Sequence, residues 1–138
     1  MKNLKQQNVE TLDIDIIRKE FERKIMDFRK YQIESRKTDV GTSAQDNLKP
    51  GWLYYALGIS GEAGELTEKI KKLFRDKEGL IDREFLDAVI KEMGDILWYM
   101  GRLSDVFGIN FNLIAETNIE KLLDRMERNK LHGEGDNR

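Results

Sequence analysis

The sequence predicts an all-α protein, a bundle of four to five helices in a single domain over residues 1–138. Along most of the chain, apolar residues recur at spacings of three and four, which is the repeat of an amphipathic helix. Runs that alternate apolar and polar residues between turn signals, as strands do, do not compete with this pattern. The only proline, Pro50, falls in a break of the helical pattern.

Four segments carry the helical pattern, and each of the three breaks between them contains glycine. The predicted helices span about Asp13–Ser35, Trp52–Phe74, Arg83–Val106 and Phe111–Asn129. A long loop, KTDVGTSAQDNLKPGW, follows the first helix, and RDKEGLID and FGIN separate the others. We expect residues 1–12 to form a loose extension and residues 132–138, HGEGDNR, a flexible tail, since the tail has no apolar residue to bury.

Composition excludes several kinds of protein. The formal net charge of −2 gives no attraction to nucleic acid or to an anionic membrane. The chain has no cysteine and one histidine, so disulfides, thiolate sites and His-rich zinc sites are excluded, and any metal must be held mainly by carboxylates. The chain shows neither a signal-peptide segment nor a run of about 20 apolar residues. We therefore expect a cytoplasmic protein.

Two pairs of acids lie on the inward side of their predicted helices. On a wheel of 100° per residue, Glu62 falls among apolar residues and Glu65 at the margin of the same stripe. Glu92 and Asp95 repeat this arrangement on the next helix. Ionised carboxylates on an apolar face are costly unless they are paired or bound to a cation. Two facing helices would bring the four acids together, and oxygen ligands without His or Cys favour Mg²⁺ or Mn²⁺.

Glycines accompany both acid pairs. Gly58, Gly61 and Gly64 surround the first pair and Gly94 lies within the second, so a neighbouring helix or a ligand could approach closely. The alternative is a non-catalytic helical interaction module, in which the acids form salt bridges between helices. Such a module would bind no divalent ion tightly and would not need glycine beside the acids.

The stretches GEAGELTEKIKK and KEMGDILWYM resemble the ExxE and ExxD motifs of the MazG-like nucleotide pyrophosphohydrolases, in the all-α NTP pyrophosphatase superfamily. The resemblance covers roughly Tyr31–Arg138, and NIEKLLDR and GDNR are also similar to bacterial and phage-encoded members. Some members carry a further acid immediately before the first motif glutamate, where this chain has Gly61.

This resemblance implies hydrolysis of a nucleoside triphosphate, often a deoxynucleotide, to the monophosphate and pyrophosphate with Mg²⁺, in nucleotide-pool cleaning. It assigns the catalytic and metal-binding roles to Glu62, Glu65, Glu92 and Asp95, and leaves open which glutamate takes the proton from water. A dUTPase-like or a phosphoribosyl-ATP pyrophosphatase-like activity on the same scaffold is the alternative within the enzyme class.

Further residues are expected to contact the substrate. Asn118, Lys121 and Arg125 form a polar strip on a packing face of the last helix, suited to phosphate oxygens and to a sugar or base edge. The strip could instead form ion pairs with the acids. The base could stack on Trp52, Trp98 or Tyr99, of which Tyr99 is placed best, and the resemblance favours one aromatic before the first motif and one after the second, although aromatics at helical spacing also build cores.

Two expectations concern closure and assembly. Arg138 would contact the triphosphate if the glycine-containing tail closes over it. Four helices of this length leave apolar surface that one chain cannot cover, so we expect a homodimer or a homotetramer, a dimer of dimers.

Overall fold

The computed structural model describes residues 26–40, 51–128 and 130, and the regular secondary structure within them is entirely helical. The elements are α2 (Phe28–Ser35), the single 3₁₀ turn η1 (Arg36–Thr38), α3 (Gly51–Lys77), α4 (Arg83–Val106) and α5 (Phe111–Glu127). The all-α prediction is confirmed for this part of the chain. Residues 13–25 of the first predicted helix, the extension and the tail lie outside the described residues.

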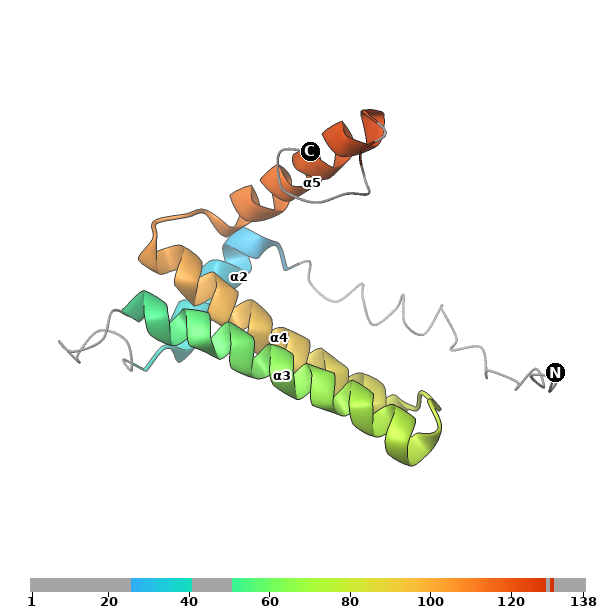
Figure 1. Ribbon diagram of the computed structural model, residues 1–138. Coiled ribbons are helices and arrows are strands. Elements are labelled where there is room, and N and C mark those ends of the chain that lie inside the picture. The colour runs from blue at the N-terminus through green and yellow to red at the C-terminus, as the bar shows by residue number, and fades with distance from the viewer. Residues whose placement is uncertain (1–25, 41–50, 129, 131–138) are drawn as a thin grey trace.

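The long helices α3 and α4 form an antiparallel hairpin and lie side by side along most of their length (Figure 1). The chain reverses at Glu78 and Gly79, whose φ angles of 50° and 79° lie in the left-handed region that glycine tolerates best. The Gly79 N–H donates to the Leu73 carbonyl at 3.1 Å and so closes the end of α3. Asp82 caps α4 by accepting a 2.8 Å hydrogen bond from the Phe85 N–H.

The predicted helix bounds agree with α4 and differ elsewhere. The first predicted helix is not continuous through Met26 and Asp27, because Asp27 is extended and caps the start of α2 by accepting from the Lys30 N–H. α3 begins at Gly51, one residue before the predicted start. α3 continues to Lys77 instead of ending at Phe74, because its last turn is polar and apolar periodicity cannot detect a helical turn that buries nothing. α5 ends at Glu127 and not at Asn129, and the Arg128 N–H donates back to the Asp124 carbonyl there.

The shorter helices gather at one end of the hairpin. α2 packs against α4 and α5, and α5 is directed away from the α3–α4 pair (Figure 1). Phe111, at the start of α5, is only 3% exposed, and its ring centroid lies 5.2 Å from that of Phe28 on α2. Gly101 on α4 faces this ring, and a Cβ there would meet the Phe111 ring in ordinary van der Waals contact at 3.7 Å.

A buried polar network fastens α2 to α4. Arg102, 3% exposed, donates to the Gln32 carbonyl at 2.6 Å and to the Ser35 hydroxyl at 2.8 Å, and its guanidinium lies 2.7 Å from Asp105. Asp105 also accepts from Arg36 and from the Gln32 amide. Burial raises the pKa of Asp105, but the bond from Arg36 and the other partners outweigh burial and hold this pKa below its usual value.

The apolar core of a single chain is small. Among the described residues, Tyr55, Leu73 and Phe111 are the buried apolar side chains. Many large apolar side chains remain exposed, including Leu57 at 63%, Phe74 at 69% and Ile90 at 65%. No helix in the described ranges combines the length and the apolar character that crossing a membrane would require.

Replacing Asp105 with Asn should destabilise the fold in a pH-dependent way. The lowered pKa means that Asp105 contributes stability above its unfolded value, about 3.8, and that this contribution is lost as the pH falls through the folded pKa. At pH 7 we expect D105N to lower the free energy of unfolding by about 2 kcal/mol, because Arg102 stays buried with one partner fewer. Urea unfolding from pH 7 to pH 2.5 measures the difference, which should shrink toward the acid end.

Asp87→Asn is the matched control, because Asp87 pairs with Arg83 on the surface of α4, where both side chains are at least 47% exposed. It should cost under about 1 kcal/mol. Equal losses for D105N at both ends of the pH range would contradict this account of the network.

Candidate metal centre

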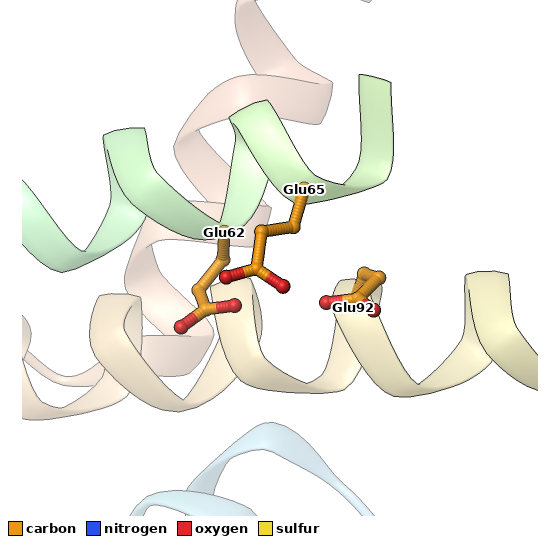
Figure 2. Close-up of side chains that lie close together, drawn as sticks. All are labelled: Glu62, Glu65 and Glu92. Atoms are coloured by element: carbon orange, nitrogen blue, oxygen red, sulfur yellow. The ribbon is translucent and has the colours of Figure 1, made fainter. Parts of the chain in front are cut away.

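Three glutamates of the hairpin converge between α3 and α4. Glu62, Glu65 and Glu92 can each place one carboxylate oxygen so that the three atoms lie within 4.8 Å of one another. In Figure 2, Glu62 and Glu65 extend from α3 toward α4, and the Glu92 carboxylate lies beside that of Glu65. We call these three residues the acid cluster. Glu92 is the most enclosed, at 9% exposure, and Glu65 faces solvent.

The geometry of the hairpin explains why these residues meet. In an antiparallel pair, residues equally far along the chain from the turn lie opposite each other. Glu65 and Glu92 are equidistant from the turn at Glu78 and Gly79, and so are Glu62 and Asp95. The spacing of three residues keeps both members of each pair on one helix face. The turn and the two motifs therefore bring acids from both helices to the same level of the hairpin.

The donor set of the acid cluster fits a hard divalent cation. Carboxylate oxygens are the ligands that Mg²⁺ and Mn²⁺ accept, and opposite ligands of octahedral Mg²⁺ lie about 4.2 Å apart. The three oxygens, all within 4.8 Å of one another, would have to draw closer together to bind one ion, since adjacent ligands of octahedral Mg²⁺ lie about 2.9 Å apart. The acid pairs of the sequence thus bring three of the four expected carboxylates together in the folded chain.

The acids repel one another. The pKa of Glu62 is raised, first by its burial and then by the charges of Glu65, Asp95 and Glu92. A divalent cation would relieve this repulsion. Among the described residues, the one ion pair that involves an acid of the cluster joins Lys69 Nζ to Glu92 Oε1 at 3.4 Å.

Asp95, the fourth predicted ligand, lies beside the acid cluster and not within its group of three oxygens. It is exposed, yet its charge contributes to the raised pKa of Glu62 and of two tyrosines, Tyr31 and Tyr99. Asp95 is therefore close enough to act on the same volume, while its direct coordination of a metal stays a prediction.

The glycines beside the acids have different surroundings. A Cβ on Gly58 would collide with the Tyr99 ring, so the close approach of α4 to α3 there depends on glycine. Gly58 and Tyr99 are also equidistant from the turn. A Cβ added at Gly61, Gly64 or Gly94 would meet no atom of the described chain within 4 Å, so no packed neighbour within one chain requires glycine at these three positions.

An aromatic group adjoins the acid cluster. Tyr99 lies 5.0 Å from Trp98 in an edge-to-face arrangement and 6.0 Å from Tyr54, measured between ring centroids. A hydrogen bond with Tyr54, followed by burial, raises the pKa of Tyr99 to about 12. Tyr99 thus stays a neutral phenol at physiological pH, and its base-stacking role stays a prediction. Trp52, in the first turn of α3, is 44% exposed.

The predicted polar strip lies on α5, away from the acid cluster. Asn118 and Lys121 line a cavity of about 670 Å³ that is otherwise mostly apolar, together with Phe28 and Met100. Arg125 is buried at 4% exposure. Within the described ranges, the acids of the cluster form no ion pair with Lys121 or Arg125, so the alternative of pairing with these acids is not observed. Arg138 lies outside the described residues.

Sequence reasoning missed two residues next to the acids. Lys69 follows Glu65 by four residues on α3, and that spacing could have identified it as a neighbour on the same face. Tyr31, on α2, places its hydroxyl 3.5 Å from the Gly94 carbonyl, and burial, followed by Asp95, raises the pKa of Tyr31. No sequence pattern indicated Tyr31, because its position depends on how α2 packs across α4.

Each helix of the antiparallel pair carries two carboxylates three residues apart. This arrangement places the protein among helical proteins with a candidate metal centre built from carboxylates. The comparisons with known proteins name the family. The model of the MazG nucleotide pyrophosphohydrolase domain matches residues 53–129, which include both motifs and α5. The Gene 37 protein of Mycobacterium phage L5 is 37% identical over 109 residues, 78% of this chain and 96% of that protein. No solved structure matched the chain. The chain belongs to the MazG family.

Replacing Glu62 with Gln should stabilise the metal-free protein. A raised folded pKa means that wild-type stability falls as the pH rises from the unfolded value, about 4.5, through the folded value, because an ionised Glu62 is opposed by its neighbours. Gln carries no charge, so E62Q should raise Tm by about 2–4 °C at pH 8 in EDTA, and this gain should fade toward pH 4.5.

The control for this measurement is Glu68→Gln, which removes one charge from the exposed side of α3, where Glu68 pairs with Lys71 and Lys72. E68Q should leave Tm unchanged or lower it slightly. A gain in E62Q that does not vary with pH would show that repulsion among the acids is not its source.

Proposed function

We propose that the protein is a Mg²⁺-dependent nucleoside triphosphate pyrophosphohydrolase that converts a (d)NTP to the (d)NMP and pyrophosphate. The observation that carries this proposal is the convergence of three carboxylates between α3 and α4 in a chain of the MazG family. Mn²⁺ is the expected substitute metal. A role in nucleotide-pool cleaning and a cytoplasmic location belong to the same proposal.

Glu62, Glu65 and Glu92 would hold the ion, with Asp95 next to them. When bound, the ion would polarise phosphoryl oxygens and lower the pKa of water. Hydrolysis of the α–β phosphoanhydride would join the water oxygen to one of its two phosphorus atoms, break the bond from that phosphorus to the bridging oxygen, and release the monophosphate and pyrophosphate. One carboxylate of the four accepts the proton of the attacking water.

The aromatic group offers a place for the nucleoside. Tyr99 and Tyr54 lie on the two helices of the hairpin, and Tyr99 is close enough to Glu62 for the carboxylate to raise the tyrosine pKa. A base stacked on these rings would hold the phosphates over the acid cluster. Trp52 is exposed near the start of α3, the helix of Tyr54, and could extend the stacking surface.

Asn118, Lys121, Arg125 and Arg138 are proposed as phosphate, sugar or base contacts. In one chain, α5 is directed away from the hairpin (Figure 1). Contact between this helix and a nucleotide at the acid cluster therefore requires α5 of a second copy or a rearrangement of α5.

We also propose a homodimer or a dimer of dimers. The exposed apolar residue Leu57 lies on α3 with the open glycines Gly61 and Gly64, and the exposed Ile90 and Met93 lie on α4. Apolar surface of this kind is costly in water, and glycines allow another helix to approach closely. A second copy would cover the apolar surface that the small core of one chain leaves exposed.

A non-catalytic helical interaction module is the second candidate, and the Lys69–Glu92 pair between the helices favours it. In that case the acids would serve only as salt-bridge partners. Binding of a divalent ion distinguishes the two candidates, because a module of salt bridges has no need of one.

The main test is a panel of canonical and modified dNTPs, including dUTP, together with phosphoribosyl-ATP, assayed for pyrophosphate release with Mg²⁺. We expect at least one substrate to yield the monophosphate and pyrophosphate, and EDTA to abolish the reaction. Glu92→Gln keeps the size of the side chain but removes its charge, so turnover should fall about 100-fold or more while the fold survives. Glu68→Gln should retain activity. Near-normal turnover in E92Q would remove Glu92 from the site.

Assembly is tested by light scattering coupled to size-exclusion chromatography. We expect the mass of a dimer or a tetramer at micromolar concentration, and we expect the double variant Ile90→Asp with Met93→Asp to shift the protein toward monomer, because charges would replace buried apolar groups. Arg83→Asp with Asp87→Arg, which exchanges charges on the exposed side of the same helix, is the control. A monodisperse wild-type monomer would contradict the proposed dimer.

A further inference from the structure

The ion pair between Lys69 and Glu92 links the acid cluster to a cation that belongs to the chain itself. Lys69 Nζ lies 3.4 Å from Glu92 Oε1, and the two side chains are 39% and 11% exposed. The pair joins α3 to α4, since Lys69 lies one turn beyond Glu65. The other lysines of this turn, Lys71 and Lys72, pair instead with Glu68 on their own helix. Lys69 thus differs from these two lysines because its partner lies on the other helix and belongs to the acid cluster.

The partner of Lys69 is the acid that depends most on a cation. Glu92 is the most enclosed member of the acid cluster, and a carboxylate held away from water beside two other carboxylates is costly without a compensating positive charge. In the metal-free chain the Lys69 ammonium supplies this charge. A divalent ion bound by the Glu92 carboxylate would supply it instead, and an ammonium and a metal ion at the same carboxylate repel each other.

We propose that Lys69 is the counter-ion of Glu92 in the metal-free enzyme, that the metal displaces its ammonium from this carboxylate, and that the displaced ammonium then binds the phosphates of the nucleotide. This inference rests on the proposed function. It adds to that function a role for Lys69, which pairs with Glu92 before the metal and nucleotide bind and with the phosphates afterwards.

The position of Lys69 suits the second partner. Its flexible four-carbon stem carries a compact charge with three donors, which suits a phosphate as well as a carboxylate. Its stem starts on α3 one turn from Glu65, so the ammonium can leave Glu92 and stay next to the acid cluster. Negative charge gathers on the departing pyrophosphate, and an ammonium at that place would stabilise it.

Lys69→Met tests the proposal because it keeps the length of the stem and removes the charge. Calorimetric titration with Mn²⁺ alone, at fixed ionic strength, measures metal affinity. Without a resident competitor, K69M should bind Mn²⁺ about three- to tenfold more tightly than wild type. With Mn²⁺ saturating, titration with inorganic pyrophosphate should show the opposite change, about tenfold weaker binding, since a charged donor to the phosphates is missing.

Lys72→Met is the matched control. It removes the same charge from the same helix, and Lys72 is 47% exposed and paired with Glu68. Any effect of net charge alone should appear equally in K72M. In EDTA, K69M should also melt about 2–4 °C below K72M, because Glu92 has lost its counter-ion.

The two changes of opposite sign separate this role from a merely structural one, which would weaken both ligands together or neither. Mn²⁺ affinity in K69M equal to or below that of K72M would overturn the counter-ion role. Unchanged pyrophosphate affinity would overturn the role toward phosphate. Failure of wild type to bind Mn²⁺ would overturn the metal centre itself, a result distinct from the other two because it appears before any substitution is made.

Discussion

The close packing of α3 against α4 is the constraint on which the rest of the structure depends. Tyr99 lies over Gly58, where any side chain would collide with its ring, and this contact fixes how the two helices are aligned. The same alignment sets Glu65 opposite Glu92 and Glu62 opposite Asp95. The acid cluster is therefore a result of helix alignment, with the turn at Glu78 and Gly79 as its midpoint.

The site opposes the stability of the hairpin that builds it. Negative charges gathered between two helices favour separation of the helices, as the raised pKa of Glu62 indicates. Other contacts supply stability near the C-terminal end of α4. These are the Arg102–Asp105 network and the buried ring of Phe111 at the start of α5. This division is common in enzymes, in which a functional site is held in an unfavourable arrangement by its surroundings.

Sequence reasoning predicted the parts of the structure that depend on local pattern. The bounds of α4 and the inward placement of Glu62 and Glu92 follow from periodicity, and the structure confirms them. The position of α5 could not be predicted, because a helical wheel shows which face of a helix is apolar but not which neighbour covers it. For the same reason Tyr31 was missed and the polar strip of α5 was expected beside the acids. Lys69 was detectable from its spacing to Glu65.

The equidistance of the paired residues from the turn has a consequence for how such chains can change in length. One residue added to α3 between Glu65 and Lys77 would rotate the first acid pair by about 100° and move it by about 1.5 Å relative to the second. The acid pairs stay opposite each other only if the parts of α3 and α4 between them and the turn lengthen together by near-whole numbers of turns. Extra residues are also tolerated where they lie outside the helices and lengthen the turn itself. The number of residues between each motif and the turn therefore matters as much as the motif itself, because it decides whether the two acid pairs face each other.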